Sequence, residues 1–103
     1  MFIKIYEYDI REDREALFLS IQEKAASIFQ AHMNCEIMLL KCLEDKTKWL
    51  EISRYNSQDD YLNGMKRVNE VPAIQYLFKE FKSCLVSDVL DIQEQNYLMK
   101  LHI

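Results

Sequence analysis

Residues 35–43 place aliphatic side chains on both faces of a predicted strand, and this feature constrains the fold more than any other. Because successive side chains of a strand point to opposite faces, Ile37 and Leu39 face one way while Met38 and Leu40 face the other. The helices predicted below can cover only one of these faces. We therefore expect a sheet whose second face is buried by something other than the helices.

A strand and a long helix are predicted at the start of the chain. Residues 2–8 alternate aromatic or aliphatic side chains with charged ones and are rich in strand-forming types, which predicts a first strand. Asp9 ends this strand and, with Glu12 three residues later, forms a helix-capping signal. We expect the helix to reach about residue 33, with one buried stripe made of Leu17, Ile21, Ala25 and Ile28.

Two further strands and a second helical region follow. Residues 35–43 and Lys48–Tyr55 have strand patterns, and the link between them is short enough to require an antiparallel hairpin. Ser57, with Asp60 at the third helical position, is a good N-terminal cap. Gly64, the sole glycine, is expected to end or loosen this short helix.

A second helical segment is predicted to begin at Pro72, because proline is favoured at the first helical position. Its apolar side chains repeat at helical spacing, as Ile74, Leu77, Phe78, Phe81 and Leu85. Residues 89–93 predict the last strand. Residues 97–103 alternate again, in a tail that extends this strand or adds an exchanged edge segment.

The element order β-α-β-β-α-β predicts the fold class. It matches the split βαβ, or ferredoxin-like, α+β arrangement, in which a four-stranded antiparallel sheet carries its helices on one face. With 103 residues, the chain is long enough for one domain, 1–103, that buries about two thirds of its unfolded surface.

The uncovered face of this sheet predicts a homodimer. Full burial of one aliphatic or aromatic side chain on this face would stabilise the protein by about 1.5 to 3 kcal/mol. Burial of several such side chains would therefore contribute more than the few kcal/mol of net stability that small domains have. A symmetric dimer that stacks two such faces uses one surface, and closed twofold dimers are the commonest oligomers. The alternative is a monomer in which residues 97–103 fold over the face.

The charge balance argues against nucleic acid as a partner. Lys and Arg total 13 against 17 Asp and Glu, the net charge is −4, and no block of basic residues is present. RNA-recognition domains share the element order, but their third strand carries a basic, glycine-containing aromatic motif. Lys48–Tyr55 offers Trp49 and Tyr55 without a glycine.

Two features indicate a reducing compartment without membrane insertion. The first residues lack the apolar core of a signal peptide, and no stretch approaches the roughly 18 apolar residues of a membrane span. Cys35, Cys42 and Cys84 form an odd set without CxxC spacing, which does not suit a disulfide framework. We expect a cytoplasmic protein with no membrane partner.

The sequence offers no motif for metal, nucleotide or hydrolase chemistry. His32 lies near the expected end of the first helix, where a cation is electrostatically favoured, and His102 lies in the tail, so the two lack metal-ligand spacing. A single glycine excludes the dinucleotide and P-loop fingerprints, and no GxSxG elbow is present. We expect no metal and no organic cofactor.

The run from Trp49 to Tyr61 resembles the antibiotic biosynthesis monooxygenase-like family. Members carry a strand similar to Glu-x-Trp followed by Glu-Ser-Glu-Glu-Ala-Phe, and here Glu51, Tyr55, Ser57 and Tyr61 occupy comparable places. The resemblance implies a ferredoxin-like protomer, a dimeric α/β barrel and a pocket between each sheet and its helices. It also implies activities that range from cofactor-independent oxygenation of quinols or polyphenols to haem degradation.

Haem degradation is disfavoured for this chain. The haem-degrading branch of the family carries an Asn on the first strand, a Trp early in the second helical region and a His about ten residues later. Here the first strand has no Asn, residues 61–65 have no Trp, and residues 74–76 hold no His.

Four side chains are candidates for a ligand pocket: Trp49, Arg54, Tyr55 and Tyr61. The aromatic rings suit a flat apolar ligand that tyrosine hydroxyls orient, and Trp49 and Tyr55 share a strand face. Arg54 suits an anionic substrate oxygen. The structural alternatives are packing in the core or dimer interface for the aromatic residues and, for Arg54, an ion pair with Glu51, Glu7 or a partner carboxylate.

These expectations combine into one functional hypothesis. We expect a homodimer that binds a small hydrophobic or aromatic molecule, with cofactor-independent monooxygenation as the activity that the resemblance implies. The alternative is a non-catalytic ligand-binding or structural dimer. The sequence identifies no catalytic residue.

Overall fold

The sheet has the strand order β2-β3-β1-β4 and every neighbouring pair is antiparallel. The computed structural model describes all 103 residues. The strands are β1 (Phe2–Asp9), β2 (Cys35–Lys41), β3 (Lys48–Tyr55) and β4 (Gln93–Leu98). The helices are α1 (Glu15–His32), α2 (Gln58–Val68) and α3 (Pro72–Cys84), with 3-10 turns η1 (Glu12–Arg14) and η2 (Val89–Asp91). This is the predicted α+β, ferredoxin-like fold.

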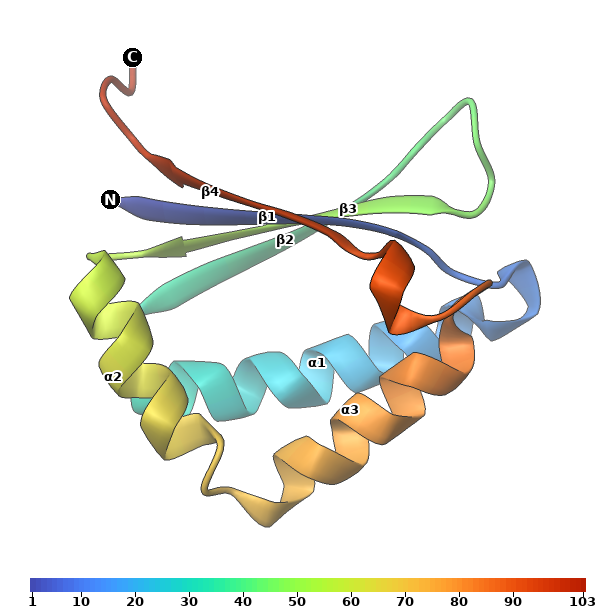
Figure 1. Cartoon of the computed structure of the whole chain (residues 1–103), viewed down its shortest axis with the longest axis horizontal. Coiled ribbons are helices and arrows are strands. Elements are labelled where there is room, and N and C mark those ends of the chain that lie inside the picture. Colours follow the sequence, from blue (N-terminus) through green and yellow to red (C-terminus); the bar gives the residue numbers. More distant parts are fainter.

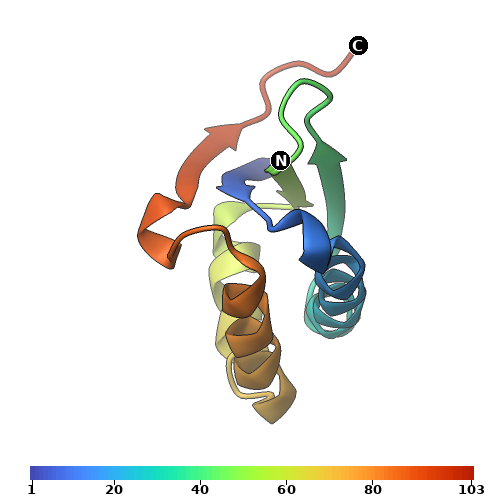
Figure 2. The same ribbon diagram turned by 90° about the vertical axis from the view of Figure 1, so that its right-hand side faces the viewer.

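All three α-helices lie on one face of the sheet (Figure 1), here called the inner face. Figure 2 shows α1 and α3 side by side beneath the strands. Strand alternation directs Phe2 and Tyr8 of β1, and Trp49 and Tyr55 of β3, to the inner face, where all four are buried. Phe18 of α1 completes the core, because its ring meets both Tyr8 and Trp49 edge-on.

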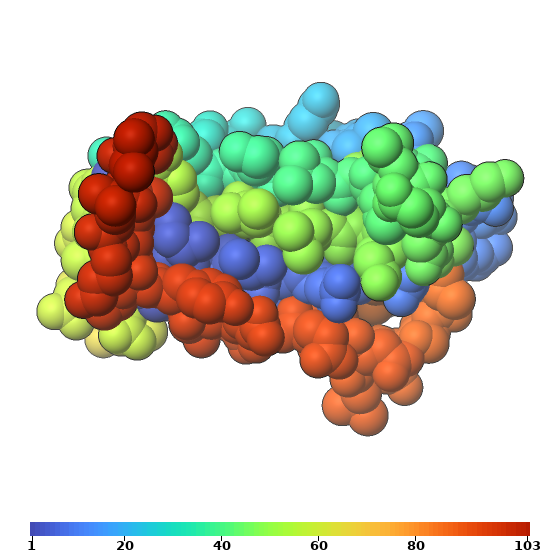
Figure 3. All heavy atoms as spheres, turned by 90° about the horizontal axis from the view of Figure 1, so that it is seen from above, coloured from blue at the N-terminus to red at the C-terminus, as the bar shows by residue number.

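The opposite, outer face of the sheet carries the second apolar surface predicted from the sequence. Met38 and Leu40 of β2 are 55% and 43% exposed there. Leu50 and Ile52 of β3 alternate with the buried inner-face residues and are only half-buried. In Figure 3, which views this face, the C-terminal tail lies along one end of the sheet, and it leaves the middle of the face uncovered.

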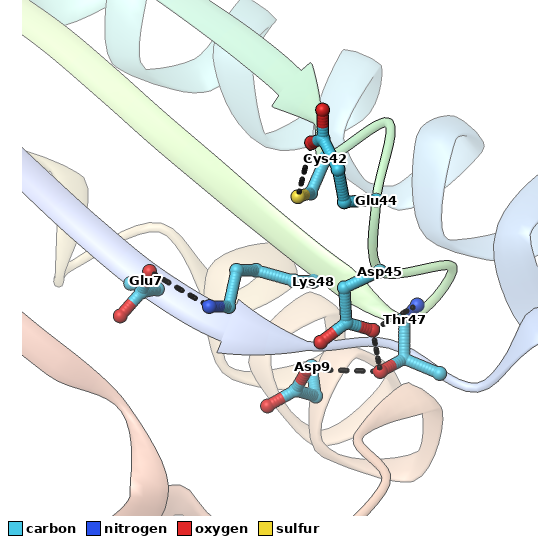
Figure 4. A network of polar contacts seen from close by, with 7 residues as sticks. All are labelled: Glu7, Asp9, Cys42, Glu44, Asp45, Thr47 and Lys48. Carbon is cyan, nitrogen blue, oxygen red and sulfur yellow. Dashed lines mark hydrogen bonds and ion pairs between the residues drawn. The ribbon is translucent and has the colours of Figure 1, made fainter.

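The connection between β2 and β3 explains why the predicted cap at Asp9 does not form. Asp9 stays in β1 and its carboxylate accepts a hydrogen bond from the Thr47 hydroxyl at 2.9 Å (Figure 4). Asp45 accepts a second bond from the same hydroxyl. Helix α1 therefore begins six residues after Asp9, at Glu15, behind the turn η1 and without a side-chain cap.

The end of β2 was also predicted too late. Its last strand residue is Lys41, and Leu43, expected in the strand, is 94% exposed in the turn. The Asp45 carboxylate accepts from the backbone N–H of Thr47, which bends the chain early. The antiparallel hairpin itself and the bounds of β3 are as predicted.

Helix α2 continues through Gly64, contrary to the prediction that this glycine ends or loosens it. The reason is packing: a Cβ at Gly64 would stand 2.6 Å from the Met33 sulfur and 2.9 Å from the Met33 Cβ. The glycine therefore permits close approach of α2 to the end of α1. The cap at Ser57 is confirmed, since its hydroxyl accepts from the Asp60 N–H at 3.0 Å, and Pro72 occupies the first turn of α3.

The last strand lies further along the chain than residues 89–93. The Asp88 carboxylate accepts from the Leu90 N–H at 2.8 Å and folds this segment into the turn η2. Strand β4 then pairs with β1 in a register that places Leu98 opposite Phe2. Every side chain of β4 is exposed. Because β4 is held by backbone hydrogen bonds to β1 and buries no side chains, its sequence lacks the apolar alternation by which a strand is predicted.

No helix of the chain is long and apolar enough to cross a membrane. Cys35, Cys42 and Cys84 are all free thiols, and two of them, Cys35 and Cys84, are buried.

Candidate functional site

A cavity of about 440 Å³ lies between the inner face of the sheet and the helices. Nineteen residues line it, fifteen of them hydrophobic, and α1, α2, α3, β1 and β3 all contribute. Seven of the lining side chains are aromatic: Tyr6, Tyr8, Phe29, Tyr55, Tyr61, Phe78 and Phe81. A volume of this size and an apolar wall with few polar groups are typical of small-molecule sites.

The exposed part of the wall lies where α2 is followed by α3. Asn69, Gln75 and Phe78 line the cavity and are exposed to solvent. On the other side, helix α1 contributes the small side chains of Ala25 and Ala26, which leave room between helix and sheet. The solvent-exposed part of the cavity wall thus lies between α2 and α3.

Glu51 is the one charged side chain of the cavity wall. Its position on β3 directs it to the inner face together with Trp49 and Tyr55. The Tyr8 hydroxyl donates to Glu51 Oε1 at 2.7 Å, and the Gln22 amide donates to the same oxygen at 3.4 Å. Burial raises the pKa of this carboxyl, and the bond from Tyr8 lowers it by less. Glu51 therefore holds its proton to a higher pH than an exposed glutamate.

The neighbouring phenols stay neutral across the physiological range. Burial raises the pKa of Tyr8, and the adjacent Glu51 carboxyl adds to that effect. Burial likewise raises the pKa of Tyr6, with further contributions from Tyr61 and Glu94. Burial also raises the pKa of Tyr55. Each hydroxyl therefore acts as a hydrogen-bonding group rather than as an anion.

A lysine is held beside the tyrosines at the β1–β4 edge. Lys4 is buried on the inner face, and its Nζ lies 4.9 Å from the centre of the Tyr61 ring and 5.6 Å from that of Tyr6. It pairs with Glu94 at 2.6 Å and donates to Asn96 at 2.7 Å. The bond from Lys4 lowers the pKa of Glu94.

The structure brings together two of the four side chains that we singled out from the sequence. Tyr55 and Tyr61 both line the cavity, and their ring centres are 4.7 Å apart. Trp49 shares the inner face with Tyr55 but is buried in the core, 5.0 Å from the Phe18 ring. Arg54 lies on the outer face, where it pairs with Glu36 at 3.5 Å.

Sequence reasoning did not select Glu51 or Tyr8 as site residues, although a signal for Glu51 was present. Glu51 has the strand parity of Trp49 and Tyr55, which predicts the same face. A carboxyl on a helix-covered face is unusual and marks a candidate site. Tyr8 had no comparable signal, because an inward tyrosine is ordinary in a core. No cluster of three or more His, Cys, Asp or Glu side chains is placed to hold a metal ion.

Comparisons with known proteins connect this architecture to one structural group. No family model matches the sequence, and no curated protein matches it either. Solved structures do match. SnoaB, a cofactor-independent oxygenase from Streptomyces nogalater, superimposes with a TM-score of 0.73 at 10% identity, over 99% of this chain and 95% of that one.

Two further structures extend the comparison. A proposed antibiotic biosynthesis monooxygenase from Bordetella bronchiseptica gives a TM-score of 0.73 at 17% identity, over 97% of each chain. An uncharacterised NIPSNAP domain protein from Burkholderia xenovorans gives 0.74 at 13% identity, over 96% of this chain and 94% of that one. The chain thus has the fold of the antibiotic biosynthesis monooxygenase-like proteins, as its resemblance predicted.

Proposed function

We propose that the protein binds a small hydrophobic or aromatic molecule in the cavity between sheet and helices. The observation that carries this proposal is the cavity itself, whose volume of about 440 Å³ is lined by seven aromatic rings and a few polar groups. A core that served only for stability would be filled by side chains, because protein interiors are close-packed.

The chemistry that we propose is oxidation of that molecule by dioxygen without a cofactor. Support comes from the shared fold with SnoaB, whose description is that of a cofactor-independent oxygenase. Fold similarity alone is a weak argument for chemistry, so the site must supply the rest. The neutral hydroxyls of Tyr6 and Tyr8, with Glu51, provide hydrogen bonds that orient an electron-rich ring.

We also propose that the protein is a homodimer in which two outer faces stack. In a monomer, Met38 and Leu40 would remain exposed to water, which is unfavourable for apolar side chains. Ion pairs lie at both ends of the face, with Glu36 next to Arg54 and Lys48 next to Glu7. Each of these ends thus carries both an acid and a base, so neither end presents a block of like charge to the other copy.

A binding screen with a blocked-cavity variant tests the proposed ligand site. We expect a panel of two-ring aromatic compounds to shift amide signals of cavity residues in NMR spectra. Ala25→Leu fills the space that Ala25 leaves at the cavity wall and should abolish the shifts. Ala31→Leu, on the exposed side of the same helix, is the matched control and should bind normally. Binding by both variants alike would contradict the site.

Oxygen uptake separates the oxygenase from a non-catalytic binding protein. Compounds that bind are incubated aerobically, and dissolved oxygen is followed with an electrode for the native chain and for Ala25→Leu. Consumption that requires the open cavity supports the proposed oxidation. Binding without any consumption, across quinols and polyphenols, would favour the non-catalytic ligand-binding dimer.

A further inference from the structure

We propose that the cavity selects a ligand with a protonated amine, which pairs with the free oxygen of Glu51 while the hydrophobic remainder lies among the aromatic rings. This inference rests on the proposed function and specifies the charge of its ligand.

The charge of the cavity wall is the first reason. Glu51 is its sole carboxyl group, and no Lys, Arg or His lines it. An anionic ligand would therefore enter a largely apolar space with no counter-charge, which is strongly unfavourable. A cation would find one carboxyl in a medium where charge pairs are stronger than in water.

The hydrogen bonds of Glu51 are the second reason. Oε1 accepts from the Tyr8 hydroxyl and from the Gln22 amide, which fixes the carboxyl in place. Oε2 makes no hydrogen bond to the protein. Only two buried side-chain polar atoms lack a hydrogen-bond partner, the Ser53 hydroxyl and the Arg54 Nε, so Oε2 is not sealed from solvent. The Glu51 carboxyl thus presents one oxygen that a ligand N–H can reach.

The aromatic rings are the third reason. Tyr6, Tyr8, Tyr55 and Tyr61 surround the same space, and the faces of such rings attract cations. The protein already uses two of them in this way, because the Lys4 ammonium lies over the rings of Tyr61 and Tyr6. The charge of Lys4 does not oppose a second cation strongly, since Glu94 pairs with it at 2.6 Å.

Amine binding is expected to depend on pH in a definite direction. Burial raises the pKa of the empty Glu51 carboxyl, so an incoming ammonium displaces its proton to the solvent. Affinity should rise as the pH increases through the pKa of Glu51 and fall again when the amine itself loses its proton. The other titratable groups of the cavity wall are the four tyrosines: Tyr6 and Tyr8 on β1, Tyr55 on β3 and Tyr61 on α2.

Three probes with one carbon skeleton test the inference: 2-naphthylmethylamine, 2-naphthylmethanol and 2-naphthoate. Affinities are measured by calorimetry for the native protein, Glu51→Gln and the control Glu44→Gln, which removes the same charge from an exposed turn. We expect the native protein to bind the amine about tenfold more tightly than the alcohol and not to bind the naphthoate. Glu51→Gln should bind the amine no more tightly than the alcohol, whereas Glu44→Gln should keep the preference for the amine.

The outcomes distinguish this inference from the proposed function. Equal or weaker binding of the amine than of the alcohol by the native protein would overturn the inference and leave the aromatic site standing. A preference for the amine that persists in Glu51→Gln would overturn it too. If none of the three probes binds, both the aromatic site and the amine preference fail. If Glu51→Gln does not fold, the order of affinities of the three probes for the native protein still tests the amine preference.

Discussion

The Tyr8 hydroxyl donates to Glu51 Oε1 across 2.7 Å and thereby ties β1 to β3 at the wall of the cavity. The two residues are not directly opposite in the strand register, since Tyr8 pairs with Trp49 and Glu51 pairs with Tyr6. The bond is therefore a diagonal one, in reach because the tyrosine side chain is long. It places a neutral donor, rather than a cation, next to the buried acid.

Removal of this hydroxyl should destabilise the protein. We expect Tyr8→Phe to lower the free energy of unfolding by about 1 to 3 kcal/mol, because a buried oxygen of Glu51 loses its best donor. Urea denaturation followed by Trp49 fluorescence measures the change. Tyr76→Phe, at an exposed position on α3, is the control and should stay within about 0.5 kcal/mol of the native protein. Equal stability of native protein and Tyr8→Phe would show that the bond contributes nothing.

Stability should fall as the pH rises above the ordinary pKa of Glu51. Burial raises the pKa of this carboxyl from its ordinary 4.5, so above that pH the folded state holds more protons than the unfolded state. The free energy of unfolding then decreases with pH, by at most about 1.4 kcal/mol for each pH unit, until the folded-state pKa is reached.

The comparison of native protein with Glu51→Gln isolates this effect. Glutamine does not titrate, so the stability difference between Glu51→Gln and the native protein should grow in favour of the variant above pH 4.5. Chemical denaturation at a series of pH values gives both curves. Glu44→Gln, in the exposed turn, should follow the native curve. Parallel curves for the native protein and Glu51→Gln would exclude a raised pKa.

A charge on the outer face should separate the proposed dimer. We expect the native protein to sediment at twice 12.4 kDa and Met38→Asp to sediment at 12.4 kDa, because the new carboxylate would be buried against the partner's apolar face. Leu43→Asp carries the same charge in the β2–β3 turn, where the side chain is 94% exposed, and should remain dimeric. A native protein that sediments at 12.4 kDa at micromolar concentration would overturn the stacked-face dimer.

Gly64 should tolerate no side chain despite its position inside a helix. Alanine is favoured over glycine in helices by about 1 kcal/mol, but a Cβ here would stand 2.6 Å from the Met33 sulfur and 2.9 Å from its Cβ. We expect the clash to dominate, with Gly64→Ala losing about 1 to 3 kcal/mol of stability.

A double-mutant cycle checks the cause. Adding Met33→Ala to Gly64→Ala relieves the contact with the methionine Sδ, so the two changes together should cost less than the sum of their separate effects. Asn63→Ala, at the exposed neighbouring position of α2, controls for helix propensity. An increase in stability on Gly64→Ala would show that propensity outweighs the contact.

Elements with a strong local signal were predictable from the sequence. The strand Lys48–Tyr55, the Ser57 cap and the start of α3 at Pro72 each depend on residues close together in the chain. The errors arose where a distant partner decides the outcome. Thr47 binds the carboxylate expected to cap α1, Met33 explains the glycine inside α2, and backbone pairing with β1 fixes the edge strand β4.

The candidate site shows the same limit. Strand parity places Tyr55 inward, and the helix that begins after Ser57 brings Tyr61 to within 4.7 Å of it. Arg54 was selected for its chemistry, although its parity is opposite to that of Tyr55 and directs it to the outer face. The 2.7 Å bond between Tyr8 and Glu51 joins residues 43 positions apart, and no local pattern encodes it.

The polar character of β4 has a consequence for how far the protein can polymerise. The polar residues 93–96 of β4, with Glu36 and Lys41 on the opposite edge strand β2, place polar side chains on both rims of the sheet, which discourages the addition of strands from further copies. In the proposed dimer, one partner covers the outer face, which is the remaining apolar surface of the sheet. Such an assembly is self-limiting, because a single contact buries the apolar surface of both copies and leaves none for a third copy.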